Sequence, residues 1–317
     1  MKKILVTRRL LKSNEERISK LWNAKLNSND KIYSKSELVK LSQDCDGILT
    51  SILDTIDEKV IIQLSDKTKI ISNFAVGFGN IDIEAARKRN IIVTNTPDVL
   101  TDATAEIAML LILGASRRAN EGIKWAKSQK WKWSSDFLLG KQLTGSKLGI
   151  LGMGRIGRAV AKRAKAFGMK IHYHNRKRLN SELENGATYH KSIQSLFSVS
   201  EVLSINCPAT KETQKIINRK TLKFFPKESV IVNSARGDMV DDDAMVEALK
   251  NKSIFALGLD VYNGEPKIHS GYLNHPNVFI LPHLGSSTIK TRTDMADLAI
   301  NNIEEFFKKG DCINRVN

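Results

Sequence analysis

The stretch "KLGILGMGRIGR", residues 147–158, decides the fold. A short apolar run leads directly into Gly152-Met153-Gly154-Arg155-Ile156-Gly157, and an amphipathic helical segment follows and ends at Gly168. In this strand–turn–helix context the first glycine makes a tight turn, the second lets the backbone approach a pyrophosphate, and the third lets helix and strand pack closely. The sequence therefore predicts a dinucleotide site at the helix N-terminus, made by Gly152, Gly154, Arg155, Ile156 and Gly157.

The next strand candidate ends unusually, in "IHYHNRKRLN" (171–180). About 20 residues beyond the glycines, such sites usually carry an acid that binds the ribose hydroxyls of NAD. Here Asn175 is followed by Arg176, Lys177 and Arg178. A carboxylate would repel a 2′-phosphate, whereas arginine offers it charge-assisted bidentate bonds. We predict that Asn175, Arg176 and Lys177 bind the cofactor, with Arg178 as a further donor. NADP(H) is then preferred and NAD(H) remains possible; the alternative is a solvated basic loop that tolerates both.

Short apolar runs alternate with amphipathic segments along the whole chain, the pattern of parallel α/β sheets. At 317 residues the chain is long for one core. We predict two doubly wound parallel-sheet domains, a flavodoxin-like substrate domain (1–98 and 286–317) and a Rossmann cofactor domain (99–285), with an interdomain cleft. A long helix is predicted through 101–118 and a last helix within 287–310. Strands are predicted at 3–7, 47–50, 69–72 and 91–95, and at 147–151, 170–174, 202–206, 229–233, 255–259 and 278–281.

Composition narrows the class of protein. Hydrophobic content of 41% and charged content of 26% are typical of a globular chain. The net charge of +16 comes from scattered Lys and Arg without an aromatic-interleaved stripe, which does not favour nucleic-acid binding but suits small anionic substrates. The longest apolar run, 107–113, is too short to span a membrane. Cys45, Cys207 and Cys312 show neither disulfide nor metal spacing, which indicates a reducing cytoplasm, and His172 and His174 lack a third metal ligand.

Three stretches carry chemically active side chains at the ends of consecutive predicted strands. "VIVNSARGDMVDDDAMVEAL" contains Arg236, "FALGLDVYNGEP" contains Asp260 and Glu265, and "FILPHLGSST" contains His283. Because ligands bind at the carboxyl ends of strands in open α/β sheets, these residues are expected to meet at one edge. An arginine, a carboxylate and a histidine together form a candidate catalytic site.

These stretches resemble the D-isomer-specific 2-hydroxyacid dehydrogenases, and within them the glyoxylate/hydroxypyruvate reductases. The resemblance covers nearly the whole chain and is close in "AVGFGNIDIEAARKRNIIVTNTPDVLTDATAEIAMLLIL" (75–113). It implies that His283 is the general acid for a keto oxygen, that Glu265 hydrogen-bonds the imidazole and favours its protonated form, and that Arg236 binds the substrate carboxylate and polarises the carbonyl. It further implies that Leu53, Val76 and Gly77 line the substrate, with Arg236 and His283 beside them. Thr104, Cys207, Pro208, Thr213, Ala235, Asp260 and Gly285 would line the cofactor, with Asp260 orienting the nicotinamide amide.

The chain departs from the family pattern at a few positions. Gly79 and Ala75 stand where the family often has aspartate and serine or glycine, which puts the substrate-side loop in question. Asn73 stands where the phosphoglycerate dehydrogenases have arginine, and no regulatory domain is expected after the last helix, so a phosphorylated substrate is not expected.

The resemblance and the residues of the pocket wall predict the reaction and the assembly. Thr50, Ser51, Ile52 and Leu53 suit a hydrogen atom or hydroxymethyl group, so the expected substrate is a small anionic 2-oxo or 2-hydroxy acid, hydroxypyruvate or glyoxylate. The alternatives are 2-ketogluconate, another D-2-hydroxy acid, or a non-enzymatic dinucleotide sensor. "SQKWKWSSDFLLG" (128–140) resembles an arm that crosses to a second subunit, with Trp133 near the partner's pocket, and a homodimer is expected. Packing of this stretch on its own domain is the alternative.

Overall fold

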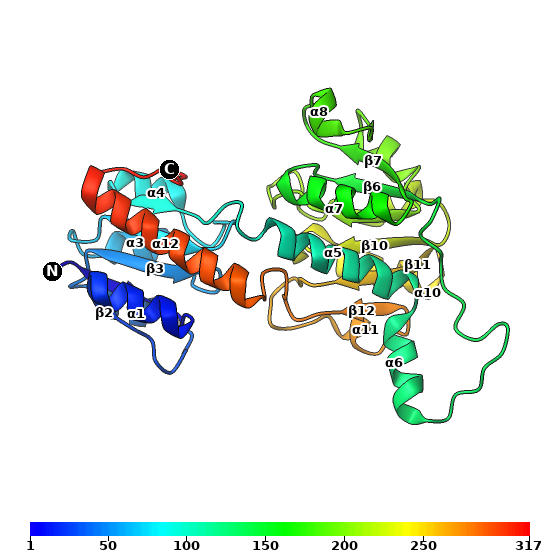
Figure 1. Ribbon diagram of the computed structural model, residues 1–317, viewed down its shortest axis with the longest axis horizontal. Coiled ribbons are helices and arrows are strands. Elements are labelled where there is room, and N and C mark those ends of the chain that lie inside the picture. The colour runs from blue at the N-terminus through cyan, green and yellow to red at the C-terminus, as the bar shows by residue number, and fades with distance from the viewer. The chain divides into compact units, whose positions relative to one another are not determined.

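The computed structural model describes residues 1–317 and divides the chain into two compact units. Unit 1 comprises Met1–Leu100 and Ser286–Asn317, and unit 2 comprises Thr101–Gly285. Each unit contains one parallel sheet flanked by helices (Figure 1), which confirms the predicted α/β class. All ten predicted strands are present, and none of their ends is displaced by more than two residues.

The sheet of unit 1 has five parallel strands in the order β2-β1-β3-β4-β5, the flavodoxin-like order. The last helix of the chain returns to this unit, where the hydroxyl of Ser72 in β4 donates to the carbonyl of Ala299 at 2.9 Å. The elements of unit 1 are β1 (Lys3–Val6), α1 (Lys12–Leu21), β2 (Asn23–Lys25), α2 (Lys35–Ser42), β3 (Gly47–Ser51), α3 (Glu58–Gln63), β4 (Ile70–Phe74), α4 (Ile83–Lys88), β5 (Ile92–Thr94) and α12 (Ile289–Lys309).

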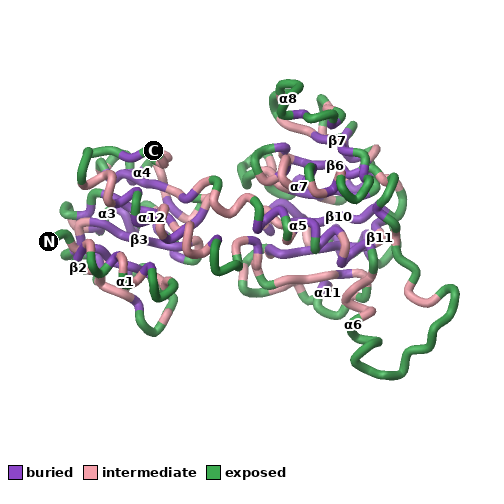
Figure 2. The backbone as a smooth tube through the Cα atoms, in the orientation of Figure 1, coloured by how far each residue is buried: buried purple, intermediate pink, exposed green.

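Alternation along the strands builds two cores in unit 1. Ile4 and Val6 face one side of the sheet and Leu5 faces the other, as expected for successive strand residues. Helices α1 and α12 complete the first core, and α3 and α4 complete the second. Figure 2 shows the buried strands between these more exposed helices. The carboxyl ends of β3 and β4 are therefore held on a rigid base.

The sheet of unit 2 has seven parallel strands in the order β12-β11-β10-β9-β6-β7-β8. Its first six strands in chain order follow the Rossmann order 3-2-1-4-5-6, so the order reverses between β6 and β9, where such folds bind dinucleotides. The elements are α5 (Thr101–Ser116), α6 (Ala119–Ser128), β6 (Lys147–Leu151), α7 (Arg155–Ala166), β7 (Lys170–His174), α8 (Ser181–Glu184), β8 (Thr188–Tyr189), α9 (Ile193–Phe197), β9 (Val202–Ile205), the 3-10 helices η1 (Thr221–Phe224) and η2 (Gly237–Met239), β10 (Ser229–Asn233), α10 (Asp242–Lys250), β11 (Ile254–Leu259), α11 (Ser270–Leu273) and β12 (Val278–Ile280).

Helices α5 and α7 cover one face of this sheet. The long helix predicted through 101–118 is α5, and Ala105, Ala108 and Leu111 are among its fully buried residues. The apolar face of α7, including Val160 and Ala164, packs in the same core as α5 and β6. This packing fixes the start of α7 at the end of β6, where the glycine-rich loop lies.

Two short strands, β2 and β8, were not predicted from the sequence. Both are edge strands, with the sequences "NAK" and "TY". An edge strand buries little side-chain surface, so its sequence lacks the apolar run by which the interior strands are recognised. No helix of the chain combines the length and the apolar character that a membrane span requires.

Candidate active site

The glycine-rich loop has the tight geometry that the sequence predicts. Gly152 has a φ of 96°, and a Cβ at this position would lie 2.5 Å from the backbone nitrogen of Cys207. A Cβ on Gly157 would lie 2.2 Å from the carbonyl oxygen of Gly152. Only glycine fits at these two positions, so the loop presses closely against both the start of α7 and the end of β9.

The N-terminus of α7 fits a dinucleotide pyrophosphate. Gly154 is the N-cap residue, no side chain caps the helix, and the first turn contains no acidic residue. A Cβ built on Gly154 meets no atom within 4 Å, so open space lies in front of the helix. The N–H groups of Ile156 and Gly157 have no acceptor in the protein. Unsatisfied N–H groups and the helix dipole together favour a bound anion at this position.

At the end of β7, Asn175 lies against the glycine-rich loop. Its Oδ1 accepts a hydrogen bond from the Met153 N–H at 2.7 Å, which leaves its Nδ2 as a donor. Arg176 and Lys177 are exposed and make no hydrogen bond within the protein. Arg176 lies near Glu212, whose pKa is lowered first by a hydrogen bond with Thr210 and also by this cation. Two of the three predicted cations are therefore open to a ligand.

Arg178, predicted as a further phosphate donor, already has a partner within the protein. Its guanidinium makes a two-bond pair with the Glu184 carboxylate, with Nε–Oε1 and Nη2–Oε2 distances of 2.8 and 3.1 Å. Glu184 also accepts from the buried Tyr173 hydroxyl at 2.5 Å. The sequence did not reveal this pair because a short helix, α8, brings Glu184 back to the strand end. Arg178 thus stabilises the loop that carries Arg176 and Lys177.

The other predicted cofactor residues lie at the same edge of the unit 2 sheet. The Thr104 hydroxyl donates to the Gly285 carbonyl at 3.0 Å and joins α5 to the loop after β12. The Thr213 hydroxyl donates to the Pro208 carbonyl at 2.9 Å and closes the turn after β9. Burial raises the pKa of the Cys207 thiol to about 11, so the thiol is protonated at neutral pH.

Arg236 follows β10 in a loop that a buried asparagine shapes. The Asn233 side chain donates to the Arg236 carbonyl at 2.7 Å and accepts from the Ala235 N–H at 3.0 Å. A Cβ on Gly237 would lie 1.9 Å from the carbonyl carbon of Tyr262, so this loop packs directly on the segment after β11. Burial lowers the pKa of Arg236, although the carboxylates of Glu265 and Asp238 oppose the shift. The only hydrogen bond of its guanidinium goes to the Ala235 carbonyl, which leaves donors for an anion.

His283 and Glu265 form the predicted pair. The distance from His283 Nδ1 to Glu265 Oε2 is 2.7 Å. Because a carboxylate only accepts, Nδ1 carries the proton, and Nε2 makes no hydrogen bond within the protein. Glu265 Oε1 accepts from the Tyr262 N–H at 2.9 Å, and the Tyr262 hydroxyl donates to the Leu281 carbonyl at 2.6 Å. These bonds hold the imidazole against the segment after β11, and they hold that segment against the residue that follows β12.

Asp260 holds the backbone on which His283 stands. It is fully buried, and its two carboxylate oxygens accept from the Leu284 and Gly285 N–H groups at 2.6 and 2.8 Å. His283 itself has a φ of 55°, in the left-handed region that non-glycine residues adopt at a cost of about 1–2 kcal/mol. The hydrogen bonds of Asp260 offset this cost. The sequence assigned Asp260 to the cofactor alone and missed this contact with the histidine loop.

The pair gives a pH-dependent stability. Burial alone would raise the pKa of Glu265, but hydrogen bonds from His283 and the Tyr262 N–H, with the charge of Arg236, hold the pKa below its ordinary value of 4.5. A lowered pKa means that the carboxylate stabilises the fold above that ordinary value and ceases to do so as the pH falls through the lowered pKa.

We expect Glu265→Gln to lower the Tm of unit 2 at pH 7 by about 2–4 °C, the effect of losing about 1 kcal/mol of charge assistance. The difference from the wild type is expected to shrink as the pH falls below 4.5. Scanning calorimetry of both proteins from pH 7 to pH 3.5 measures this; an equal difference at all pH values would contradict the role of the carboxylate charge.

In unit 1, the residues assigned to the substrate follow β3 and β4. The N–H groups of Val76 and Gly77 have no acceptor in the protein, while their carbonyls accept from the side chains of Asn95 and Asn73. The side chain of Leu53 is 45% exposed. Two neighbouring N–H donors fixed in one loop suit a carboxylate.

No group of residues in the chain is suited to hold a metal ion. His172 and His174 both contact His190, the residue after β8: His172 Nδ1 lies 2.9 Å from His190 Nε2, and His174 Nδ1 lies 2.8 Å from the His190 carbonyl oxygen. These histidines connect the last two strands of the sheet.

Comparison with known proteins identifies the family. The family model described as "D-isomer specific 2-hydroxyacid dehydrogenase, NAD binding domain" matches residues 109–285. The chain is 39% identical over 313 residues to a glycerate dehydrogenase of Hyphomicrobium methylovorum, which covers 98% of this chain and 97% of the relative. The chain belongs to the D-isomer-specific 2-hydroxyacid dehydrogenase family.

Other members agree in sequence and structure. A glyoxylate reductase of Thermococcus litoralis is 40% identical over 312 residues, with 96% of this chain and 94% of the relative covered. The crystal structure of an NADPH-dependent glyoxylate/hydroxypyruvate reductase from Sinorhizobium meliloti, in complex with NADP and malonate, superposes with a TM-score of 0.89. It is 32% identical and covers 99% of this chain and 96% of its own. As a member of this family, the protein is a nicotinamide-dinucleotide-dependent 2-hydroxyacid dehydrogenase.

Proposed function

We propose that the protein uses NADPH to reduce a small 2-oxo acid, hydroxypyruvate or glyoxylate, to the D-2-hydroxy acid. The observation that carries this proposal is the His283–Glu265 pair, whose Nε2 is unused, together with the half-buried Arg236, whose donors are largely unused. The names of the relatives, glyoxylate reductase and glycerate dehydrogenase, support the same substrate class.

His283 is the proposed general acid. Glu265 holds the proton on Nδ1, so the second ring proton stands on Nε2 when the imidazole is charged. The Glu265 carboxylate also fixes the orientation of the ring. Donation from Nε2 to the keto oxygen converts the carbonyl into a hydroxyl while the bound cofactor supplies the hydride to carbon. The reverse transfer would serve oxidation of the hydroxy acid.

Arg236 is the proposed ligand of the substrate carboxylate and a donor to the carbonyl oxygen. Burial makes its interaction with an anion stronger than at an exposed site. The free N–H groups of Val76 and Gly77 are the proposed remainder of the carboxylate site, and Leu53 is the proposed wall beside the substrate side chain. Negative charge that grows on the oxygen in the transition state is stabilised by Arg236 and His283.

The proposed cofactor residues share unit 2 with the catalytic pair. The helix N-terminus at Gly154–Gly157 takes the pyrophosphate, and Asn175, Arg176 and Lys177 take the adenosine ribose and its 2′-phosphate. Asp260 keeps lone pairs for the nicotinamide amide beyond those used by Leu284 and Gly285. Thr104, Cys207, Pro208, Thr213, Ala235 and Gly285 complete the proposed lining.

The preference for NADPH is proposed to depend on Arg176. We expect Arg176→Ala to raise the KM for NADPH about 10-fold, because one charge-assisted hydrogen bond to an exposed phosphate is lost. The KM for NADH should change little, since NADH has no 2′-phosphate. Steady-state kinetics with each cofactor measures both values.

Arg178→Ala is the matched control for Arg176. Its guanidinium is paired with Glu184, so its loss should lower the thermal stability and change the KM for both cofactors to a similar degree. A wild-type protein that prefers NADH, or an Arg176 variant with an unchanged KM for NADPH, would overturn the proposed preference.

The substrate range tests the proposed function as a whole. Initial rates with saturating NADPH are to be measured for glyoxylate, hydroxypyruvate, 2-ketogluconate, pyruvate and phenylpyruvate. We expect the highest kcat/KM for hydroxypyruvate or glyoxylate, because the wall around Leu53 suits a hydrogen atom or hydroxymethyl group. A higher value for 2-ketogluconate would favour that alternative activity, and a higher value for phenylpyruvate would refute the small-acid proposal.

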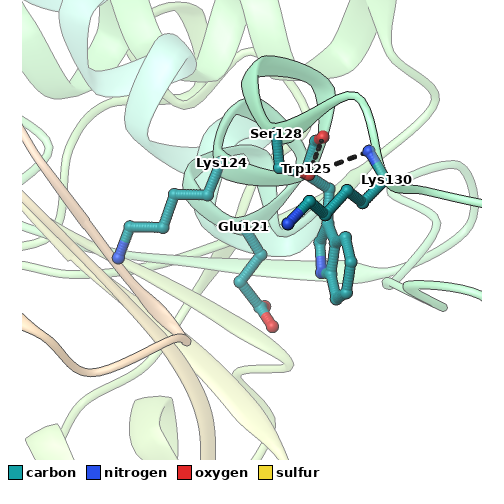
Figure 3. Close-up of a pocket in the computed structure, with 5 residues that line it drawn as sticks. All are labelled: Glu121, Lys124, Trp125, Ser128 and Lys130. Carbon is teal, nitrogen blue, oxygen red and sulfur yellow. Dashed lines mark hydrogen bonds between the residues drawn. The ribbon is translucent and has the colours of Figure 1, made fainter.

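A homodimer is proposed from the surface of unit 2. Helix α6 has no buried residue, and its side chains Ile123 and Trp125 are 50% and 42% exposed. The segment 129–140 after it leaves Trp131, Trp133 and Leu139 exposed by 52%, 83% and 61%. An open cavity of about 340 Å³ beside α6 is lined by Glu121, Lys124, Trp125, Ser128 and Lys130, whose side chains are drawn in Figure 3. Several large exposed apolar side chains within one segment favour a protein interface there.

We expect the double substitution Trp131→Ser with Leu139→Ser to convert a dimer into a monomer of 35.5 kDa. The substituted side chains lose apolar burial at the interface while the core of unit 2 stays intact. Analytical ultracentrifugation of both proteins measures the mass. A wild-type protein that sediments as a monomer at micromolar concentration would contradict the proposed dimer.

A cytoplasmic location is also proposed, since all three cysteines are free thiols.

A further inference from the structure

The loop that carries Val76 and Gly77 does not depend on Gly79 for its shape. A Cβ built on Gly79 meets no atom within 4 Å, and its φ is not in the left-handed region. The family often has aspartate at this position, and the available space shows that glycine there is no conformational requirement. The loop must therefore be held by another residue.

Asn80 is the residue that holds this loop to the neighbouring one. Its Nδ2 donates to the carbonyls of Ser51 and Asp54 at 3.0 and 3.1 Å. Its Oδ1 accepts from Asn73 Nδ2 at 3.3 Å, and the same Nδ2 donates to the Gly77 carbonyl at 2.9 Å. Two asparagine side chains thus connect the loop after β3, which bears Leu53, with the loop after β4, which bears Val76 and Gly77.

Asp54 fixes the loop after β3 to the ends of β1 and β3. This carboxylate is 1% exposed, and its Oδ2 accepts from the Thr7 hydroxyl at 2.5 Å, the Thr50 hydroxyl at 2.9 Å and the Ser51 N–H at 3.0 Å. The Leu53 N–H donates to the Ser51 hydroxyl at 3.3 Å. These bonds of Asp54 do not involve Asn80. A substitution of Asn80 is therefore expected to free the loop after β3 from the loop after β4 without unfolding it.

We propose that Asn80 is a positioning residue that sets the separation between Leu53 and the N–H groups of Val76 and Gly77. This inference rests on the proposed function, in which those residues surround the substrate side chain and carboxylate. The Asn80 amide fixes both loops at once, so it determines the size of the side chain that fits between them. The selectivity for small 2-oxo acids therefore depends on an amide that does not touch the substrate.

A merely structural role for Asn80 makes a different prediction. Loss of general stability would lower the Tm and the amount of active enzyme, which reduces the rate with all acids by the same factor. Release of Leu53 from the Val76–Gly77 loop instead changes the acids unequally, because only a bulky side chain gains from a wider site. The ratio of kcat/KM values for hydroxypyruvate and phenylpyruvate separates these two roles.

The experiment compares the wild type with Asn80→Ala, Asn73→Ser and the control Gly79→Ala. Each acid is varied at saturating NADPH, and the KM for NADPH is measured at saturating hydroxypyruvate. We expect Asn80→Ala to raise the KM for hydroxypyruvate about 10-fold or more, as displacement of a binding group by a fraction of an ångström does. The kcat should change less, the hydroxypyruvate-to-phenylpyruvate ratio should fall, and the KM for NADPH should stay the same. Gly79→Ala should match the wild type, since its Cβ enters open space.

Asn73→Ser keeps the bonds from Asn80 to Ser51 and Asp54 but removes the donor to the Gly77 carbonyl. It breaks the same link between the two loops, so it should also raise the KM for hydroxypyruvate and lower the hydroxypyruvate-to-phenylpyruvate ratio, and it tests this link even if Asn80→Ala is poorly folded. Unchanged KM and ratio in either folded variant, or an equal loss for both acids in Asn80→Ala, would overturn the inference. A wild type that reduces none of the acids would instead refute the proposed function.

Discussion

Replacing His283 with asparagine is expected to lower kcat with hydroxypyruvate and NADPH by about 10²- to 10⁴-fold, the contribution of a positioned general acid. Asparagine is chosen because the backbone at this position has a φ of 55°, which asparagine tolerates better than alanine does. The substitution removes Nε2 as a donor but leaves the Asp260 bonds to Leu284 and Gly285 in place. Steady-state kinetics at pH 7 measures the loss.

Binding of NADPH to the His283→Asn variant, followed by fluorescence, is the control, and its Kd should equal that of the wild type. The double variant with Glu265→Gln should be little slower than His283→Asn alone, because Glu265 acts through the imidazole and residues that act as a unit are not additive. A His283→Asn enzyme that retains a tenth or more of the wild-type kcat would remove His283 as the proton donor.

Replacing Arg236 with glutamine is expected to lower kcat/KM for hydroxypyruvate by about 10³-fold, since removal of one partner of a buried charge pair costs about 2–5 kcal/mol. Both the KM and kcat should suffer, because the guanidinium is proposed to bind the carboxylate in the ground state and to stabilise the oxygen in the transition state. Arg236→Lys keeps the charge but loses the planar fork, so it should recover only part of the loss.

The Arg236 variants need a test of their fold. Asn233 holds the Arg236 backbone through the carbonyl, not through the side chain, so the loop should survive the substitution. An unchanged Kd for NADPH and an unchanged Tm would show this. A selective rise in the KM for NADPH, with an unchanged KM for hydroxypyruvate, would instead place Arg236 on the cofactor.

Much of this site can be predicted from short contiguous segments of the sequence. The order of β6, the three glycines and α7 is contiguous, and each of Arg236, Glu265 and His283 follows a recognisable strand. Parallel strands end at one edge of a sheet, so the positions of the strands in the sequence are enough to predict that these residues lie at the same edge. The pair of His283 and Glu265 at 2.7 Å follows that reading.

The contacts that the sequence did not reveal are long-range and polar. Glu184 forms an ion pair with Arg178, and Asp260 accepts hydrogen bonds from the backbone after His283. Asn80 joins two loops that are about 25 residues apart in sequence. None of these partners has a spacing signature, because a hydrogen bond between loops depends on the path of both loops. Buried polar residues at strand ends, such as Asn73 and Asn233, are the one signal that marks such positions, since a buried polar group needs a partner.

The central claim is that His283, Glu265 and Arg236 serve NADPH-dependent reduction of a small 2-oxo acid to the D-hydroxy acid. The most direct measurement incubates the wild-type protein with hydroxypyruvate and NADPH, follows NADPH oxidation, and determines the configuration of the glycerate on a chiral column. We predict one D-glycerate formed for each NADPH oxidised, and a rate that His283→Asn abolishes. Formation of L-glycerate, or no NADPH oxidation above a protein-free control with either hydroxypyruvate or glyoxylate, would contradict the account.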